Sequence, residues 1–484
     1  MGNTESVVVQ KRLARFRPEE RPLIEGVFER LQGDGGSGKV LTLESFKSSM
    51  DTLASDSMIK RVYRAACCVE SGAGTATVTG SGKAITAATS GVSREQLVVF
   101  LADLLRGTAE ERAPLVLAMS QEGAGNSEVV TREQVSQFLQ DVLSSVVKIL
   151  VSRERLRGWK LDRMGDVSMG VKLLAEQMCS ELKASERGTC DVCSLEDWVF
   201  RVSQVAAYLE LLVSEGLAVV LPNRPPLTLL PACLEAPWSK LKCLLDLPTL
   251  MFLAPQLPDS YSAPWRLLFT TQLHGESFSR MVAGLSKRGP TLLLIRDTRG
   301  HVFGAFASHA WEVKPQFQGQ PHGSWRIALE KIVHSQVHRS WFCGDSRCFL
   351  FSVYPRLRVY TATGYNQHFM YLNQNQQTMP NGLGMGGQHG YFGLWLDSDF
   401  GRGHSRARPK CTTYGSPQLS ADEEFTLDYA EVWAVGKPPA PEEGEEGRGK
   451  RSVLDMDPEV QAMMEMAGKT LHSQGLREPE EDED

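Results

Sequence analysis

Apolar residues along the chain follow two different spacings. In residues 1–222 they recur every three or four positions, which places them on one face of α-helices. One such run is Leu97, Phe100, Leu101, Leu104 and Leu105. In residues 223–436 they form short β-branched and aromatic runs separated by Gly and Pro, which is typical of strands and turns. The pattern therefore predicts a helical part followed by a strand-rich part, an α+β fold.

The stretch 290–306 gives the clearest strand signal in the second part. It reads as an apolar run, a turn closed by Gly300 and a second apolar run, which predicts a β-hairpin. Aromatic content supports the same division, because residues 1–222 contain 10 Phe, Trp and Tyr residues and residues 223–436 contain 28.

Proline and charge mark the boundaries between segments. Pro222, Pro225, Pro226 and Pro231 break helices and stiffen the chain between the two parts. The segments expected are an N-terminal segment (1–20), a helical domain (21–222), a Pro-rich linker (223–239), a strand-rich domain (240–436), an acidic linker (437–453), a C-terminal helix (454–475) and an acidic tail (476–484).

The helical part contains a degenerate repeat. Residues 34–45 have the length and ending of a 12-residue EF-hand loop. Weaker copies of the ending are residues 92–97, 130–135 and 193–198, and position 12 of the four loops is Ser45, Gln96, Gln134 and Asp197. Calcium requires a bidentate Glu at that position, so EF-hand-like helix pairs without metal are predicted. The same endings also fit ordinary helix N-caps.

The N-terminus carries a lipidation signal. Met1 to Ser6 fit the M-G-x-x-x-[ST] pattern, which predicts myristoylation of Gly2. One myristoyl chain binds membrane only marginally, so a second signal is needed. We expect four basic residues close to the membrane to supply this second signal by attracting anionic lipid: Lys11, Arg12, Arg15 and Arg17. The alternative is a solvated helix start with no membrane role.

Charge and cysteine content exclude several classes of protein. The net charge is −6, but residues 437–484 hold 6 basic and 14 acidic residues, so residues 1–436 carry +2. A net charge this close to zero does not create the positive electrostatic field that nucleic-acid binding requires. The apolar runs are too short for a membrane span or a secretory signal, so the 10 cysteines are expected to be reduced thiols in the cytosol.

An ordered series of short motifs in the second part carries a family resemblance. It includes residues 265–269, 274–277, 384–387, 390–397 and 431–433. Over residues 240–436 the chain resembles the TLDc-domain family, and its acyl acceptor and EF-hand-like half resemble the mTOR-associated, lysosomal branch of that family. The resemblance implies an antiparallel β-sandwich core flanked by helices, no established catalytic activity, and a role in oxidative-stress resistance or endolysosomal biology through binding the V-ATPase.

Candidate catalytic groups are few. His274-Gly275-Glu276 has the H-x-E form of zinc deaminases, but no P-C-x-x-C follows it. The glycine-rich residues 382–387 lack the Lys-Ser/Thr of a P-loop, and we expect them to let the backbone turn where side chains would clash. Glu276 and Glu431 are a candidate acid–base pair. An enzyme, hydrolase or redox, with a site among these groups is one alternative function, and no cofactor or metal is predicted.

The C-terminal helix has one apolar face. Asp457 and Pro458 form a helix start, and the apolar stripe that follows consists of Val460, Met463, Met464, Ala467 and Leu471. The stripe has three possible sites: the chain's own domains, a groove on a partner, or a membrane, which the neighbouring acidic residues disfavour.

Together these features predict a non-enzymatic adaptor on the cytosolic face of lysosomal or endosomal membranes, with a cytoplasmic pool. Its expected partners are V-ATPase subunits, components of the mTOR complex and, through the myristate, the membrane. It would modulate the V-ATPase or mTOR-linked nutrient and stress signalling. A scaffold for a kinase complex is a further alternative.

Overall fold

The computed structural model describes residues 7–33, 39–69, 91–122, 127–222, 225, 227–258, 261–318 and 346–437. They belong to one compact unit, Met1–Lys437, while Pro438–Asp484 form a second unit. Gly2 and the C-terminal helix predicted over 454–475 lie outside the described residues.

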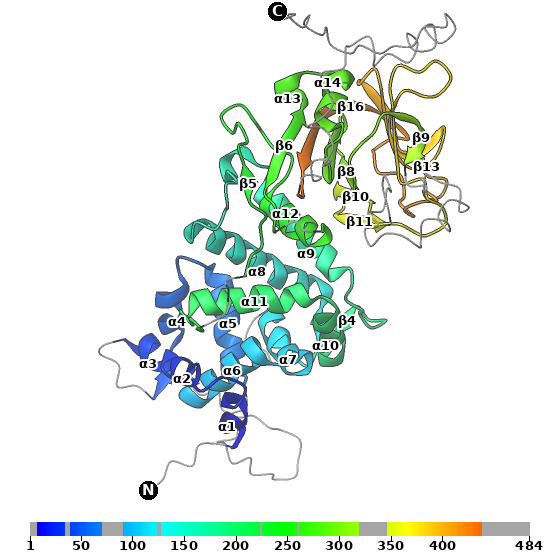
Figure 1. The fold of residues 1–484 in the computed structure, drawn as a ribbon. Coiled ribbons are helices and arrows are strands. Elements are labelled where there is room, and N and C mark those ends of the chain that lie inside the picture. Colours follow the sequence, from blue (N-terminus) through cyan, green and yellow to red (C-terminus); the bar gives the residue numbers. More distant parts are fainter. Residues whose placement is uncertain are drawn as a thin grey trace, which may run out of the picture. The chain divides into compact units, whose positions relative to one another are not determined.

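The first part is helical, as predicted (Figure 1). Its described helices are α1 (Val7–Leu13), α2 (Arg21–Glu25), α3 (Val27–Gln32), α4 (Leu43–Met50), α5 (Asp56–Cys67), α6 (Arg94–Arg106), α7 (Ala109–Ser120), α8 (Arg132–Ser152), the 3-10 turn η1 (Leu161–Arg163), α9 (Val167–Cys179), α10 (Val192–Arg201) and α11 (Ser203–Gly216). The apolar run Leu97–Leu105 of α6 is buried, which confirms the helical spacing.

Helix α8 is, among the described residues, the one helix long and apolar enough to cross a membrane. Within the fold it is a core helix: Val135, Phe138, Leu139 and Val142 are buried, and it packs against α9 and α11.

Short strands join the helix–loop–helix units in pairs. β1 (Val40–Leu41) pairs with β2 (Val92–Ser93), and β3 (Val130–Thr131) pairs with β4 (Thr189–Cys190), all antiparallel. Each strand leads within two residues into a helix, namely α4, α6, α8 and α10. This is the predicted arrangement of EF-hand-like pairs.

The helix caps explain two of the four loop endings and correct the last one. Gln96 and Gln134 close capping boxes with Ser93 and Thr131, so these side chains bond the helix N-terminus where an EF-hand Glu would bind calcium. The fourth ending begins three residues earlier than the sequence pattern predicts. α10 is capped by Asp191, which accepts from the backbone N of Ser194, so position 12 is Ser194 and not Asp197.

The second part is a curled sheet whose strands run from green to orange in Figure 1. Its strands are β5 (Cys233–Leu234), β6 (Trp265–Thr270), β7 (Thr291–Asp297), β8 (Val302–Ala307), β9 (Lys314–Gln318), β10 (Phe349–Tyr354), β11 (Arg358–Thr361), β12 (Met370–Asn373), β13 (Gly382–Gln388), β14 (Tyr391–Asp397), β15 (Arg402–His404) and β16 (Glu424–Ala434). Its helices are α12 (Leu247–Leu253), the 3-10 turn η2 (Ala254–Gln256), α13 (Thr271–His274) and α14 (Phe278–Leu285).

The strand order along the sheet is β11-β10-β8-β7-β16-β15-β14-β13-β12-β9, and β6 also pairs with β16. The hairpin predicted over 290–306 is β7 and β8, which pair antiparallel. Strand β16 joins both halves of the sheet, because its start pairs with β15 and its end with β7 and β6. The sheet therefore curls around a core of its own.

Successive side chains of β7 point to opposite faces of the sheet and pack in two different hydrophobic cores. Leu293 and Ile295 pack in the core enclosed by the curled sheet, while Leu292 and Leu294 pack in the core shared with the helical part. The segment predicted as a Pro-rich linker, 223–239, takes part in this packing, because β5 within it pairs in parallel with β6.

Candidate docking site at the domain junction

Helix α1 is fixed to the helical part by the basic residues that were expected to face a membrane. Arg12 Nη1 lies 2.7 Å from Glu111 Oε1, and Arg12 Nε lies 2.5 Å from Asp103 Oδ1. Arg15 Nη1 donates to Glu111 Oε2 at 2.6 Å. Lys11 and Arg17 are exposed. Carboxylates therefore neutralise two of the four cations, and these ion pairs join the N-terminal segment to α6 and α7, while the contact of this segment with a membrane stays a prediction.

The two carboxylates in this cluster have opposite pKa shifts. Burial raises the pKa of Asp103 to about 6, although Arg12 and Arg15 lie beside it. The hydrogen bond from Arg15 lowers the pKa of Glu111 to about 2. Val9, Leu13 and Phe16 are also buried, so α1 is held by apolar contacts as well as ion pairs.

Replacing Arg15 with alanine is expected to loosen α1, because the bidentate ion pair between Arg15 and Glu111 is lost. We expect the free energy of unfolding to fall by about 1–2 kcal/mol. Hydrogen exchange of the α1 amides should accelerate, as measured by mass spectrometry. The exposed Arg17 is the matched control, and Arg17→Ala should leave α1 exchange unchanged. Equal acceleration in both variants would contradict the role of the ion pairs.

Two of the candidate catalytic features, His274 and the glycine-rich segment, are occupied in the fold. Thr270 N donates to His274 Nδ1 at 3.1 Å, and the imidazole stacks on Phe269 with ring centroids 5.3 Å apart. Glu276 is exposed. The glycine-rich segment is strand β13, where rings of Phe392 and Trp395 occupy the space above Gly384. His274 thus has a structural role, and the glycines admit aromatic rings. At Gly386 and Gly387 the backbone has positive φ, but both residues lie inside β13, so the expected turn of the chain is not found there.

Metal ligands are not grouped in the described ranges: no set of three or more His, Cys, Asp and Glu side chains there is arranged to hold a metal ion. The loop 34–45 is described only from residue 39 onward, so the absence of calcium from it stays a prediction.

Four tryptophans meet where the helical part joins the sheet. The Trp159 ring centroid lies 5.2 Å from that of Trp433, 5.8 Å from that of Trp238 and 5.9 Å from that of Trp265. Trp159 Nε1 donates to the carbonyl of Pro231 at 2.9 Å. We call these four residues the tryptophan cluster. It connects the segment after α8, the linker, β6 and β16.

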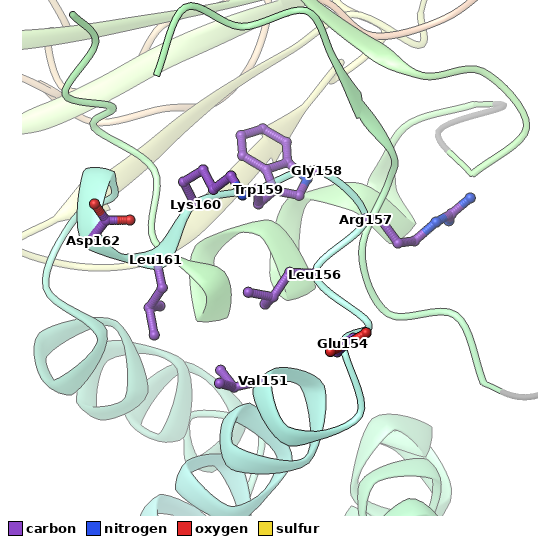
Figure 2. A pocket seen from close by; sticks show the side chains of 9 residues that line it. All are labelled: Val151, Glu154, Leu156, Arg157, Gly158, Trp159, Lys160, Leu161 and Asp162. Atoms are coloured by element: carbon purple, nitrogen blue, oxygen red, sulfur yellow. The ribbon is translucent and has the colours of Figure 1, made fainter. Parts of the chain in front are cut away.

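A groove of about 640 Å³ lies beside this cluster (Figure 2). It is lined by residues Val151, Glu154, Leu156, Arg157, Gly158, Trp159, Lys160, Leu161 and Asp162. Figure 2 shows Val151, Leu156 and Leu161 projecting into the same hollow, with charged residues around it. Val151, near the end of α8, is 41% exposed. An apolar floor with a charged rim is the composition of a protein-docking surface.

A second hollow, of about 890 Å³, shares Asp162 with the groove. It is lined by Asp162, Met164, Gly165, Asp166, residues 242–244, Thr271, Gln272, Glu276, Arg296, Val302, Asp428 and Tyr429. Beneath it Glu431 is fully buried. Sequence reasoning considered Glu431 only as an acid–base partner of Glu276. A stronger signal was available, because Glu431 interrupts the apolar run from Ala430 to Ala434 at the end of β16.

Comparison with curated proteins matches the whole chain. It is 58% identical over 490 residues to MTOR-associated protein MEAK7 of Danio rerio and 39% identical over 497 residues to MTOR-associated protein MEAK7 of Homo sapiens. Each match covers 100% of both proteins. The chain belongs to the MEAK7 family.

The TLDc domain family matches residues 239–324 and 332–436. Oxidation resistance protein 1 of Bos taurus is 31% identical over 180 residues, which is 37% of this chain and 16% of that protein. The resemblance to TLDc proteins, and to their mTOR-associated branch, is confirmed by these matches.

Proposed function

We propose that the chain is a non-enzymatic adaptor on the cytosolic face of lysosomal and endosomal membranes, with a cytoplasmic pool. N-terminal myristate recruits it, and it binds the V-ATPase and modulates the pump or mTOR-linked nutrient and stress signalling. The observation that carries the adaptor role is the full-length similarity to proteins named as MTOR-associated. The positions of His274 and the glycine-rich strand support it, because both serve the fold.

The junction supports a role in binding. The tryptophan cluster connects the helical part to the TLDc domain. A partner that binds the helical part therefore also fixes the position of the TLDc domain, and the reverse holds as well. The groove at Val151, Leu156 and Leu161 offers an apolar contact with charges around it. A second contact is proposed for the stripe Val460, Met463, Met464, Ala467 and Leu471, which lies outside the described residues.

Replacing Gly2 with alanine tests recruitment. The variant cannot be myristoylated, so its membrane-bound fraction after cell fractionation should fall several-fold. The ion pairs of Arg12 and Arg15 sharpen this expectation, since only Lys11 and Arg17 remain exposed to attract anionic lipid. Asn3→Ala is the control, because it keeps Gly2 and Ser6. Unchanged membrane recovery of Gly2→Ala would refute the anchor.

The partner is tested by co-purification from cells under conditions that preserve the assembled V-ATPase. V-ATPase subunits should be recovered with the intact protein and be lost with Ala467→Asp, which places a charge within the apolar stripe. Ala462→Asp is the control, because residue 462 lies on the opposite side of a helix from the stripe. Absence of pump subunits from the intact protein would refute the partner, and equal loss in both variants would refute the stripe.

A scaffold for a kinase complex is the second candidate, and the name of the relatives favours it. It predicts that mTOR-complex components, rather than pump subunits, remain bound after a high-salt wash.

A further inference from the structure

Tyr365 is an exposed aromatic residue on a loop that the rest of the TLDc domain holds in place. It lies in residues 362–368, which connect β11 to β12 and which we call the tyrosine loop. Tyr365 is 80% exposed. Its ring therefore contributes little to the packing of the fold, and its fixed position needs another explanation.

The tyrosine loop is hydrogen-bonded to Thr412 and Thr413 on both sides of Tyr365. Before the tyrosine, Thr363 Oγ1 donates to the carbonyl of Thr412 at 2.7 Å, and Thr363 N donates to the carbonyl of Thr413 at 2.8 Å. After it, Asn366 Nδ2 donates to Thr412 Oγ1 at 3.0 Å, and Thr413 Oγ1 donates to Asn366 Oδ1 at 2.7 Å. The N–H of Tyr365 itself donates to Thr363 Oγ1 at 3.2 Å. These bonds fix the backbone that carries the ring.

The glycine-rich strand β13 supports the same loop. His368 Nδ1 donates to the carbonyl of Gly387 at 2.6 Å, and Gly386 N donates to the carbonyl of His368 at 3.1 Å. Gly387 N donates to Thr413 Oγ1 at 2.8 Å. A side chain is excluded at Gly387, because φ is +85° and a Cβ would lie 2.1 Å from the carbonyl oxygen of Tyr391. The end of β13 thus anchors the tyrosine loop to the sheet.

A rigid loop that presents an exposed tyrosine has the properties of a binding anchor. Ordering a surface loop costs conformational entropy, and here that cost is met without burying the ring. Tyrosine is among the residues that contribute most to binding energy at protein interfaces. A side chain that is already fixed before binding loses less entropy when a partner covers it.

Charge beside the tyrosine loop indicates the kind of partner. Residues 361–368 and 408–416 contain two cations, Arg408 and Lys410, and no Asp or Glu. Both cations are exposed. Arg408 donates to both carboxylate oxygens of Glu423, whereas Lys410 forms no ion pair with the described residues. Lys410 lies two residues before Thr412, which holds the loop, so a free positive charge accompanies the exposed ring.

We propose that Tyr365 and Lys410 form a docking surface for an acidic segment of a partner protein. The tyrosine ring packs against the apolar part of that segment, and its hydroxyl group donates to a carboxylate. Lys410 neutralises a second carboxylate, which favours an acidic partner over a basic one. The proposal depends neither on myristoylation nor on the V-ATPase.

Photo-crosslinking of the full-length protein in cells tests this surface. Benzoylphenylalanine in place of Gln367, an exposed residue of the tyrosine loop, should crosslink to protein segments rich in Asp and Glu, identified by mass spectrometry. Tyr365→Ala in the same chain should lower the crosslink yield about thirtyfold, the change in affinity expected for a hot-spot tyrosine. Lys410→Glu should lower it about tenfold or more, because it brings like charges together.

Three controls separate docking from general effects. Lys172→Glu reverses an exposed cation on α9 and should leave the yield unchanged. Benzoylphenylalanine in place of Phe200, which is 78% exposed on α10, should not capture the same acidic segments. Thr363→Val keeps the tyrosine but removes the hydroxyl that bonds Thr412 and the Tyr365 N–H. It should accelerate hydrogen exchange of the Tyr365 amide and lower the yield several-fold, because the ring is no longer fixed.

The docking surface is refuted if residue 367 forms no crosslinks, or if its crosslinks go to lipid or to basic segments. It is equally refuted if Tyr365→Ala keeps the wild-type yield. Urea unfolding decides whether the ring serves the fold instead. Tyr365→Ala should unfold at the wild-type midpoint, because the side chain is exposed. A clearly lower midpoint would mean a structural role for Tyr365 and would overturn the proposal.

Discussion

Replacing Trp159 with alanine is expected to lower the free energy of unfolding by about 3–5 kcal/mol, the cost of removing a large buried ring. Trp159 is 1% exposed and contacts the rings of Trp238, Trp265 and Trp433. Its removal leaves a cavity at the point where the helical part meets the sheet, and the Pro231 carbonyl loses its donor. Urea unfolding followed by far-UV circular dichroism measures the change.

Two further variants separate the causes of this loss. Trp159→Phe keeps an aromatic ring and removes only the indole N–H and some volume, so its cost should be about 1–2 kcal/mol. Trp238→Ala removes a ring that is only partly buried and should cost less than Trp159→Ala. If Trp159→Ala unfolds with the wild-type midpoint, the tryptophan cluster does not connect the two parts.

Local sequence patterns were sufficient for the helices and for one hairpin. The spacing of Leu97 to Leu105 identifies the buried face of α6, because that face is determined by residues within one helix. The hairpin of β7 and β8 is similarly local, with its turn closed by Gly300.

The fourth loop ending shows where local patterns fail. Asp191 and Ser194 are both acceptable N-caps, and each precedes an apolar helical run. The choice is made by pairing of β4 with β3, about sixty residues earlier in the chain. Pairing between strands this far apart in the chain cannot be predicted from the sequence of either strand alone.

The basic residues of α1 show the same limit for charge. Their sequence gives a cationic helix, but Asp103 and Glu111, which neutralise Arg12 and Arg15, come about ninety residues later. The spacing of Val9, Leu13 and Phe16 did contain a signal, since it gives α1 an apolar face that must be covered. A helix covered on one face brings its flanking cations close to the surface that covers it.

A substitution in the glycine-rich strand β13 is the second one expected to lower the free energy of unfolding strongly. Gly384 lies in β13, opposite Tyr371 of β12 and Trp395 of β14. A Cβ at this position would lie 2.6 Å from Phe392 Cδ1 and 3.0 Å from Trp395 Cε3. These rings stack with centroids 4.5 Å apart and are almost fully buried, so neither has space to move. Gly384→Val should lower the free energy of unfolding by about 3 kcal/mol, measured by urea unfolding.

Gly401 provides the matched control, because a Cβ there meets no atom within 4 Å and its φ is not positive. Gly401→Val should change the free energy of unfolding by less than about 0.5 kcal/mol. A double-mutant cycle then tests whether the clash itself is the cause. Phe392→Ala removes the ring that a Cβ at residue 384 would strike, so adding Gly384→Ala to it should cost clearly less than Gly384→Ala costs in the wild type. Strictly additive costs would mean that Gly384 is required for its backbone and not for the space it leaves to the rings.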